Sequence, residues 1–69
     1  MTLDEYRIEC GWSHAKMARA AEVDVQTVKR ALKGEPITSN SAHKLARAIS
    51  KELDQKIRYN QIDGLNVIL

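Results

Sequence analysis

Four long polar side chains fall on one face of a segment near the middle of the chain. On a helical wheel at about 100° per residue, residues 24–33 separate into an apolar side and a side of long hydrogen-bonding groups. The polar side consists of Gln26, Lys29, Arg30 and Lys33. In the major groove of DNA, glutamine can bond adenine N6 and N7, and arginine can bond guanine O6 and N7. This face therefore has the chemistry to read base edges.

Two smaller side chains border this face. Val25 can touch the methyl group of thymine, and Thr27, close to the helix start, can bond a phosphate beside the free backbone N–H groups. We therefore expect DNA base contacts from Val25, Gln26, Lys29 and Arg30. An ordinary amphipathic helix with a solvated polar face gives the same stripe, and the stripe alone favours that interpretation. The short connection before this helix and the basic middle of the chain reverse the preference.

Phosphate contacts are expected around the same face, because they fix the position of a protein on the duplex. The candidates are His14, Thr27, Lys33, Thr38 and Ser39. His14 stands at the start of the preceding helix, where a plain surface residue is nearly as good an interpretation.

Few residues are spaced for other kinds of chemistry. His14 and His43 stand apart, and neither has a cysteine or a second acidic ligand at a metal-binding spacing. Cys10 is the single cysteine, which excludes an intramolecular disulfide and fits a reducing cytoplasm. The three glycines are too widely separated to form a phosphate-binding loop, and no nucleophile motif occurs. We therefore expect no metal, no cofactor and no enzymatic activity.

Basic charge is concentrated in the middle of the chain. Of the net charge of +2, residues 14–51 contribute +5, because eight Lys or Arg oppose three acids there, and the two flanks are acidic. A basic segment suits a polyanion such as DNA, although a solvated helical surface explains it equally well. The 69 residues suffice for one domain with a thin stability margin, which a partner subunit would improve. No apolar run approaches the roughly 20 residues of a membrane span.

Helix starts can be placed from their capping residues. Thr2 and Glu5 form a capping box, and Gly11 can end that first helix in a left-handed conformation. Three further N-caps are Ser13, Asp24 and Thr38. Each of these is flanked by two apolar residues at the spacing of a hydrophobic staple. The staple pairs are Trp12 with Met17, Val23 with Val28, and Ile37 with Ala42.

The second and third helices follow each other closely. Helix two spans about Ser13 to Ala20, and only three residues separate it from the helix that Asp24 caps. A connection this short forces a steep crossing, as in a helix-turn-helix. The fourth helix has an apolar pattern that can run on through Leu53 to Ile57. Its predicted buried residues are Ala42, Leu45, Ala46 and Ile49.

The last dozen residues leave two interpretations open. Residues 57–62 and 65–69 contain apolar residues on both sides of Asp63-Gly64, a pair typical of a β-hairpin turn. A fifth short helix followed by a frayed tail is the rival. An isolated hairpin is marginal in water, so a hairpin here requires a surface to lie on.

Residues 11–24 resemble the lambda-repressor-like helix-turn-helix family, which includes Cro and Xre-type regulators. That family typically shows Gly-Leu-Ser-Gln, then an apolar residue and Ala, then Ala-Gly-Val-Ser. Here Ala18 matches the small residue where the two helices touch, Val23 matches the apolar turn residue, and Asp24 replaces the serine cap.

Residues 25–34 look closer to the Lac-repressor branch of the same fold, with its pattern Thr-Val-Ser-Arg-x-Leu-Asn-Gly. Lys29 and Lys33 are departures from that pattern. The resemblance covers residues 3–53 in all. It implies a phosphate contact from Thr27, and the base contacts that it implies are Val25, Gln26 and Arg30.

Three departures bear on how contacts transfer from the family. Glu22 stands where the family prefers glycine, and a left-handed backbone there costs about 1 kcal/mol. Family members often pair a glutamate at the position of Leu32 with an arginine at the position of Arg7. Without that pair, Arg7 has to find another acid or a phosphate. His14 replaces a phosphate-contacting glutamine.

We therefore predict an all-α fold of four to five short helices with a helix-turn-helix, ended by a C-terminal β-hairpin or an extended tail. Residues 1–53 would form the DNA-binding domain, and residues 54–69 a C-terminal extension that serves as a dimerisation element. The predicted function is sequence-specific binding of double-stranded DNA. The chain would act as a small transcriptional regulator of the Cro or repressor kind in a bacterial cytoplasm, encoded by a bacterium or a phage.

The expected assembly is a homodimer on a palindromic operator, with no membrane contact and no small-molecule effector domain. Its candidate surfaces are Ile8, which points away from the apolar face of the first helix, and the tail residues Leu65, Val67, Ile68 and Leu69. Two rival functions remain. One is an architectural or recombination-directionality factor that bends DNA, and the other is a protein-interaction module such as an antitoxin.

Overall fold

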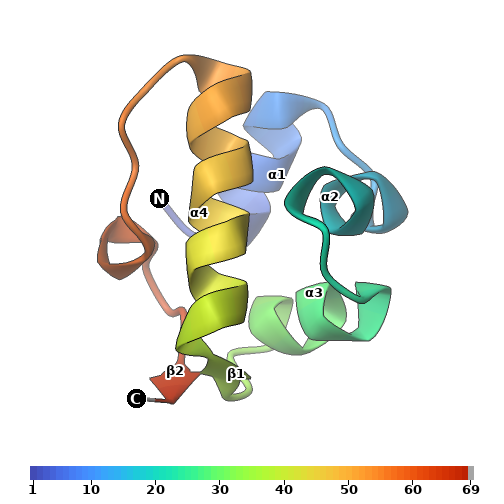
Figure 1. The fold of residues 1–69 in the computed structure, drawn as a ribbon, viewed down its shortest axis with the longest axis vertical. Helices are drawn as coiled ribbons and strands as arrows, with labels where there is room; N and C mark the ends of the chain where they lie inside the picture. Colours follow the sequence, from blue (N-terminus) through green and yellow to red (C-terminus); the bar gives the residue numbers. More distant parts are fainter. Residues whose placement is uncertain (69) are drawn as a thin grey trace.

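Four α-helices and a short parallel sheet make up the computed structural model, which describes residues 1–68 (Figure 1). Its helices are α1 (Leu3–Cys10), α2 (His14–Ala21), α3 (Val25–Leu32) and α4 (Ser39–Leu53). The strands are β1 (Ile37–Thr38) and β2 (Val67–Ile68), and a 3-10 turn, η1 (Tyr59–Gln61), lies between α4 and β2. The predicted set of short helices is confirmed, but the fold is mostly helical and not all-α, because a two-stranded sheet is added to the helices. Within residues 1–68, no helix is both long enough and apolar enough to cross a membrane.

Each helix begins at the capping residue predicted for it. Thr2 Oγ1 accepts the Glu5 N–H at 3.2 Å, and Glu5 Oε1 accepts the Thr2 N–H at 2.8 Å, which completes the capping box. Gly11 ends α1 with the expected left-handed backbone, at a φ of 72°. The other three caps, Ser13, Asp24 and Thr38, accept backbone N–H groups at 3.1, 2.8 and 3.2 Å. These bonds satisfy donors that a helix start leaves free.

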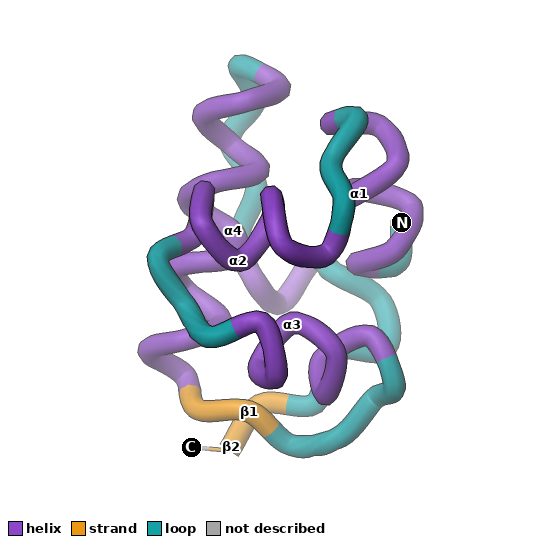
Figure 2. The backbone as a smooth tube through the Cα atoms, turned by 90° about the vertical axis from the view of Figure 1, so that its right-hand side faces the viewer, coloured by secondary structure: helices purple, strands orange, loops and turns teal. Residues whose placement is uncertain are grey.

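Three residues connect α2 to α3, which lie next to each other (Figure 2). Glu22 adopts the predicted left-handed conformation, with a φ of 58°, at a cost of about 1 kcal/mol. The next residue helps to hold this turn, because the Val23 N–H donates to the Ala18 carbonyl at 3.0 Å. Val23 also packs half-buried against the core. The side chain of Asp24 then starts α3.

The longest helix, α4, lies between the other helices and the C-terminal segment (Figure 1). Its predicted buried stripe of Ala42, Leu45, Ala46 and Ile49 is confirmed. Met17 of α2 and Val28 of α3 are fully buried in the same core. Full burial of side chains of this size is worth about 1.5–3 kcal/mol each. This packing holds α2 and α3 in place, because such short helices are unstable alone.

The fourth helix ends at Leu53 and does not continue to Ile57. Asp54 takes a left-handed backbone with a φ of 52°, which closes the helix. Ser50 then fixes the chain that follows, since its Oγ accepts the Ile57 N–H at 3.0 Å. The same Oγ lies 2.7 Å from the Ala46 carbonyl oxygen, to which the hydroxyl can donate. Ile57 is buried as a result of this reversal.

Of the two interpretations left open for the last dozen residues, the β-hairpin is wrong, because β2 pairs in parallel with β1. The short helix of the other interpretation is present as the 3-10 turn η1, and the chain after it is extended. The apolar residues Ile57 and Ile62 are both buried in the one core. Side chains at positions 57 and 62 of a single strand would face opposite sides. Burying both therefore requires a break in the extended chain, which η1 provides between them.

The tail pairs with distant parts of the chain. β2 lies parallel to β1, with Val67 opposite Ile37, and the Ile37 N–H donates to the Asn66 carbonyl at 2.9 Å. Asp63 forms a β-bridge with Thr2. The predicted exposure of Ile8 is confirmed, and Ile68 is also exposed, whereas Leu65 and Val67 are half-buried against the protein's own core. Leu69 lies outside the described residues.

Candidate nucleic-acid interface

The polar side of α3 is exposed along its length. α3 buries Val28 and Ala31 on one side and half-buries Leu32. The opposite side presents Gln26, Lys29, Arg30 and Lys33, all four exposed. Their common orientation follows from the helical period, since the apolar residues that dock α3 leave one polar stripe outward. Val25 and Thr27 are half-buried, as their border positions predict.

The guanidinium group of Arg30 is engaged by its own chain. Its Nη2 donates to the carbonyl oxygen of Pro36 at 3.2 Å, and its Nε lies 3.7 Å from Glu35 Oε1. Both side chains of the ion pair are about half exposed, so water screens the attraction and the pair is weak. A base contact from Arg30 requires its guanidinium to leave Glu35.

An open depression joins the start of α2 to the N-terminal half of α3. It measures about 500 Å³, and its lining includes His14, Val25 and Lys29. Three of the predicted contact residues are therefore brought together. Arg7 and Ser13 complete the same wall, which gives the depression three groups that can be cationic.

Arg7 pairs with an acid of its own helix, Asp4. Its Nε and Nη2 both lie 2.9 Å from Asp4 Oδ1, and its Nη1 donates to the Trp12 carbonyl at 2.7 Å. The side chain is only 20% exposed. Arg7 thus ties α1 to the segment before α2 and keeps a positive charge at the edge of the depression. Sequence reasoning did not include it among the contact residues.

The remaining residues predicted to contact phosphate differ in their exposure and in whether their side chains already form hydrogen bonds. Lys33 is exposed at the end of α3. The hydroxyl of Thr38 is committed to the start of α4, because Oγ1 accepts the Ser41 N–H and also donates to Ser41 Oγ at 3.1 Å. Ser39 is half-buried in the first turn of α4. A phosphate contact from Thr38 would therefore compete with its role as a cap.

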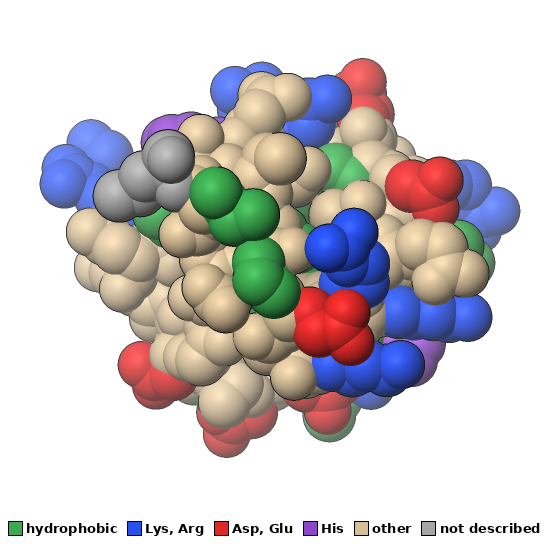
Figure 3. Space-filling view, turned by 90° about the horizontal axis from the view of Figure 1, so that it is seen from below, with side chains coloured by type: hydrophobic (Ala, Val, Ile, Leu, Met, Phe, Trp, Pro, Cys, Tyr) green, Lys and Arg blue, Asp and Glu red, His purple; other side chains and the backbone are tan. Residues whose placement is uncertain are grey.

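On the face of the molecule where β1 and β2 lie, many of the positive side chains are on the half next to α3. Figure 3 shows Lys and Arg on the side where Figure 1 places α3, with acidic side chains among them. Glu35 also places a carboxylate close to Arg30 of α3. Attraction of a phosphate backbone by this surface is therefore reduced locally by the protein's own carboxylates.

Other reactive groups do not add to this surface. Across residues 1–68, no three His, Cys, Asp or Glu side chains are grouped so that they could hold a metal ion. Cys10 is half-buried at the end of α1. Burial raises the pKa of its thiol above the ordinary value of 9.0, and the carboxylates of Glu52 and Glu9 raise the pKa further. The thiol is therefore protonated at neutral pH and a poor nucleophile.

Comparison of the chain with protein-family models, with curated proteins and with solved structures gave no match in any of the three.

Proposed function

We propose that this protein binds double-stranded DNA sequence-specifically as a small transcriptional regulator in the cytoplasm of a bacterium. In this proposal α2, the three-residue connection and α3 work as a helix-turn-helix, and α3 enters the major groove. The observation that carries the proposal is the placement of the exposed α3 stripe, whose outward residues all have long hydrogen-bonding side chains, on a helix that follows α2 after three residues and packs against it. Those are the side chains that base edges accept as partners.

The dimensions of α3 support this role. An α-helix with its side chains is about 10–12 Å across, which fits the major groove of about 12 Å width, and the eight residues of α3 present the polar stripe along about 12 Å of helix. The depression beside His14 and Lys29 would then follow a phosphate strand, as the contacts at the groove edge require. We expect base contacts from Val25, Gln26, Lys29 and Arg30, and phosphate contacts from His14, Thr27 and Lys33.

A single α3 covers only a few base pairs, so specificity favours two copies on one site. A two-fold dimer would place two α3 helices about 34 Å apart on a palindromic operator. Ile8 and Ile68, the two most exposed large apolar residues within residues 1–68, are candidates for such a contact.

Selection of bound sequences from a random pool of duplex DNA tests the proposal. The expected result is an enriched palindromic motif with half-sites one helical turn apart, bound with strong salt dependence. No enrichment, together with salt-insensitive binding, would refute it and favour the protein-interaction module. An enriched site bent strongly in a circular permutation assay would instead favour the architectural factor.

Substitutions on α3 test the assignment of the face. Arg30→Ala and Gln26→Ala should each weaken binding to the selected site by about 1–3 kcal/mol and leave non-specific binding nearly unchanged. Lys56→Ala, an exposed change in the segment after α4, is the matched control and should have little effect. Equal specific affinity of the α3 variants and the native protein would show that another surface reads the DNA.

A further inference from the structure

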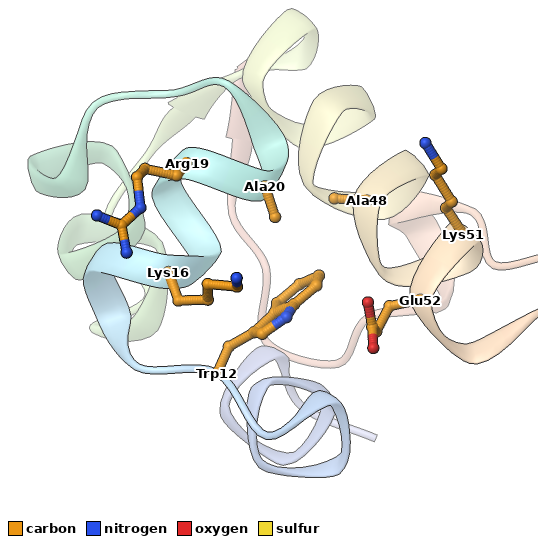
Figure 4. Close-up of a pocket in the computed structure, with 7 residues that line it drawn as sticks. All are labelled: Trp12, Lys16, Arg19, Ala20, Ala48, Lys51 and Glu52. Atoms are coloured by element: carbon orange, nitrogen blue, oxygen red, sulfur yellow. The ribbon is translucent and has the colours of Figure 1, made fainter.

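A groove between α2 and α4 takes no part in the proposed DNA contacts. Its main depression measures about 530 Å³. The indole ring of Trp12 lies in it between the two helices, and the methyl groups of Ala20 and Ala48 face it from either side (Figure 4). Trp12 is only 7% exposed. Such small side chains on both helices give the groove an apolar base that another helix can approach closely.

Cations surround this apolar base. Lys16 and Arg19 belong to α2 and Lys51 to α4. A second depression of about 180 Å³ shares Ala20, Ala48 and Lys51 and adds Lys44 and Arg47. Within residues 1–68, none of these five cations forms an ion pair. The groove also contains two acids, Glu22 and Glu52, so it carries a net positive charge of 5 − 2 = +3.

The outward face of α1 has the complementary pattern. Ile8 is 62% exposed, the highest value among the exposed large hydrophobic residues of the described chain. Glu5 and Glu9 stand on the same outward side of the helix, because α1 buries Leu3 on the other. Asp4, also on α1, is paired with Arg7. One exposed apolar side chain is thus flanked by two carboxylates that no cation of residues 1–68 neutralises.

We propose that the groove between α2 and α4 receives the outward face of α1 from a second copy of this chain. Ile8 would cover the apolar base formed by Trp12, Ala20 and Ala48. Glu5 and Glu9 would approach the cations of the groove walls, Lys16 and Lys51 among them. Apolar contact supplies affinity, and opposite charges fix the orientation.

The position of α1 next to the groove favours a reciprocal contact. α1 leads through Gly11 directly into Trp12, and Figure 4 shows α1 at the edge of the depression beneath that residue. The outward face of α1 and the groove between α2 and α4 are therefore neighbours on each copy. In a two-fold dimer, α1 of each copy can lie in the groove of the other, so that the same contact forms twice. The proposal depends on the shape and charge of these surfaces and does not rest on DNA binding.

A charge-exchange experiment without DNA tests the proposal. One variant, Glu5→Gln with Glu9→Lys, makes α1 basic and keeps the capping box, because glutamine serves there as well. The other variant, Lys16→Glu with Lys51→Glu, makes the groove acidic. Sedimentation equilibrium at low salt should show self-association of the native protein at concentrations up to about 1 mM, as for a small interface. Each variant alone should dimerise at least about tenfold more weakly.

An equimolar mixture of the two variants should regain association, to within about threefold of the native protein. In the mixture each basic α1 meets an acidic groove and each acidic α1 meets a basic groove. The indole N–H of Trp12, the single tryptophan, gives a local NMR signal that should shift on association. Native protein that stays monomeric, variants that still associate, or a mixture that does not recover would overturn the proposal.

The apolar part of the contact is tested with a matched pair of substitutions. Ile8→Ser should weaken self-association, and Ile68→Ser, which removes another exposed isoleucine at 56% exposure, should not. Circular dichroism checks that every variant folds, which exposed substitutions should permit. A stronger effect of Ile68→Ser than of Ile8→Ser would place the interface on the tail and refute the groove.

Discussion

Among the single side chains, Arg30 shows most directly how neighbours can restrain a contact residue. Its guanidinium lies near Glu35 and bonds the Pro36 carbonyl, although its place on α3 predicts a partner on DNA. A carboxylate so close to the proposed interface also repels phosphate. In the proposed complex, Glu35 would therefore restrain Arg30 and lower the affinity for any DNA, whereas a base that forms two bonds to Arg30 would displace it.

Glu35→Gln should consequently strengthen DNA binding by about two- to fivefold at low salt, the size expected for an exposed ion pair. The gain should be larger for random DNA than for the selected site, so that specificity falls. Fluorescence anisotropy on both DNAs measures this ratio. Asp54→Asn makes the same charge change away from both α3 and the groove between α2 and α4 and is the control, because asparagine also tolerates the left-handed backbone at this position. An equal gain in the two variants would mean that only net charge matters.

Cys10 predicts a dependence of stability on alkaline pH. The pKa of its thiol is raised in the folded protein, first by burial and then by Glu52 and Glu9. The folded state therefore holds the thiol proton more tightly than the unfolded chain does. This contribution to stability is complete below pH 9.0, the ordinary thiol pKa, and is lost as the pH rises through the folded pKa.

Urea unfolding of the native protein and of Cys10→Ala at pH 7 and pH 10 measures this effect. The native protein should lose more free energy of unfolding between these pH values than the variant does. Other groups that titrate at high pH are common to both proteins and cancel. An identical loss in both proteins would show that the thiol pKa is not raised by folding.

At the scale of the elements, Ser50 connects α4 to the segment that follows it. Its Oγ is the acceptor of the partly buried Ile57 N–H. Ser50→Ala leaves that donor without its acceptor, which should destabilise the protein by about 1–3 kcal/mol. Thermal and urea unfolding measure the change. Ser41→Ala is a comparison on the same helix, and its loss should be smaller, because the Ser41 side chain bonds only the exposed Thr38 hydroxyl. A larger loss for Ser41→Ala would contradict this role of Ser50.

The elements also show where sequence patterns are sufficient. Caps act over two or three residues, so Thr2, Ser13, Asp24 and Thr38 identify all four helix starts from the sequence. The left-handed backbone of Glu22 was predicted in a different way, from the glycine that the resembled family prefers at this position. The hydrogen bond from the Ile57 N–H to Ser50 was not predictable, because no sequence pattern indicates that a serine within a helix bonds a residue seven positions further on.

In the tail and in the candidate site, too, contacts between distant residues could not be predicted from local sequence patterns. Asp63-Gly64 predicts a hairpin from local residues, but the partner of β2 is β1, and the burial of both Ile57 and Ile62 excludes a continuous strand. The exposed stripe of α3 was predictable from its period. Glu35 was missed as a neighbour of Arg30. Arg7 was expected to bind an acid or a phosphate, but its place beside Val25 and Lys29 was not predicted, because it depends on how the chain folds back.

For the whole molecule, the tail is a part of the fold as well as a candidate interface. Leu65 and Val67 pack against the core, and Asn66 accepts the Ile37 N–H. Removal of residues 65–69 should therefore lower the free energy of unfolding by about 2–3 kcal/mol, from lost apolar burial and a lost backbone bond. Differential scanning calorimetry at several protein concentrations measures this loss.

Two point variants separate the roles of the tail. Val67→Ser should reproduce part of the loss, because Val67 is half-buried, whereas Ile68→Ser should change stability by less than about 0.5 kcal/mol. A truncated protein as stable as the native one would mean that the pairing of β1 with β2 contributes nothing to the fold.

The parallel pairing of β1 with β2 also sets an order for folding. The helix caps join residues two or three positions apart, whereas Asn66 and Gly34 are 32 positions apart and Met1 and Asp63 are 62 apart. Local helices form within microseconds, and contacts distant in sequence form more slowly, after the cost of closing long loops. The pairing of β1 with β2 should thus form last during folding and break first during local unfolding. Brief openings there would release Ile37 for amide exchange while the Ile49 amide, within α4, stays protected.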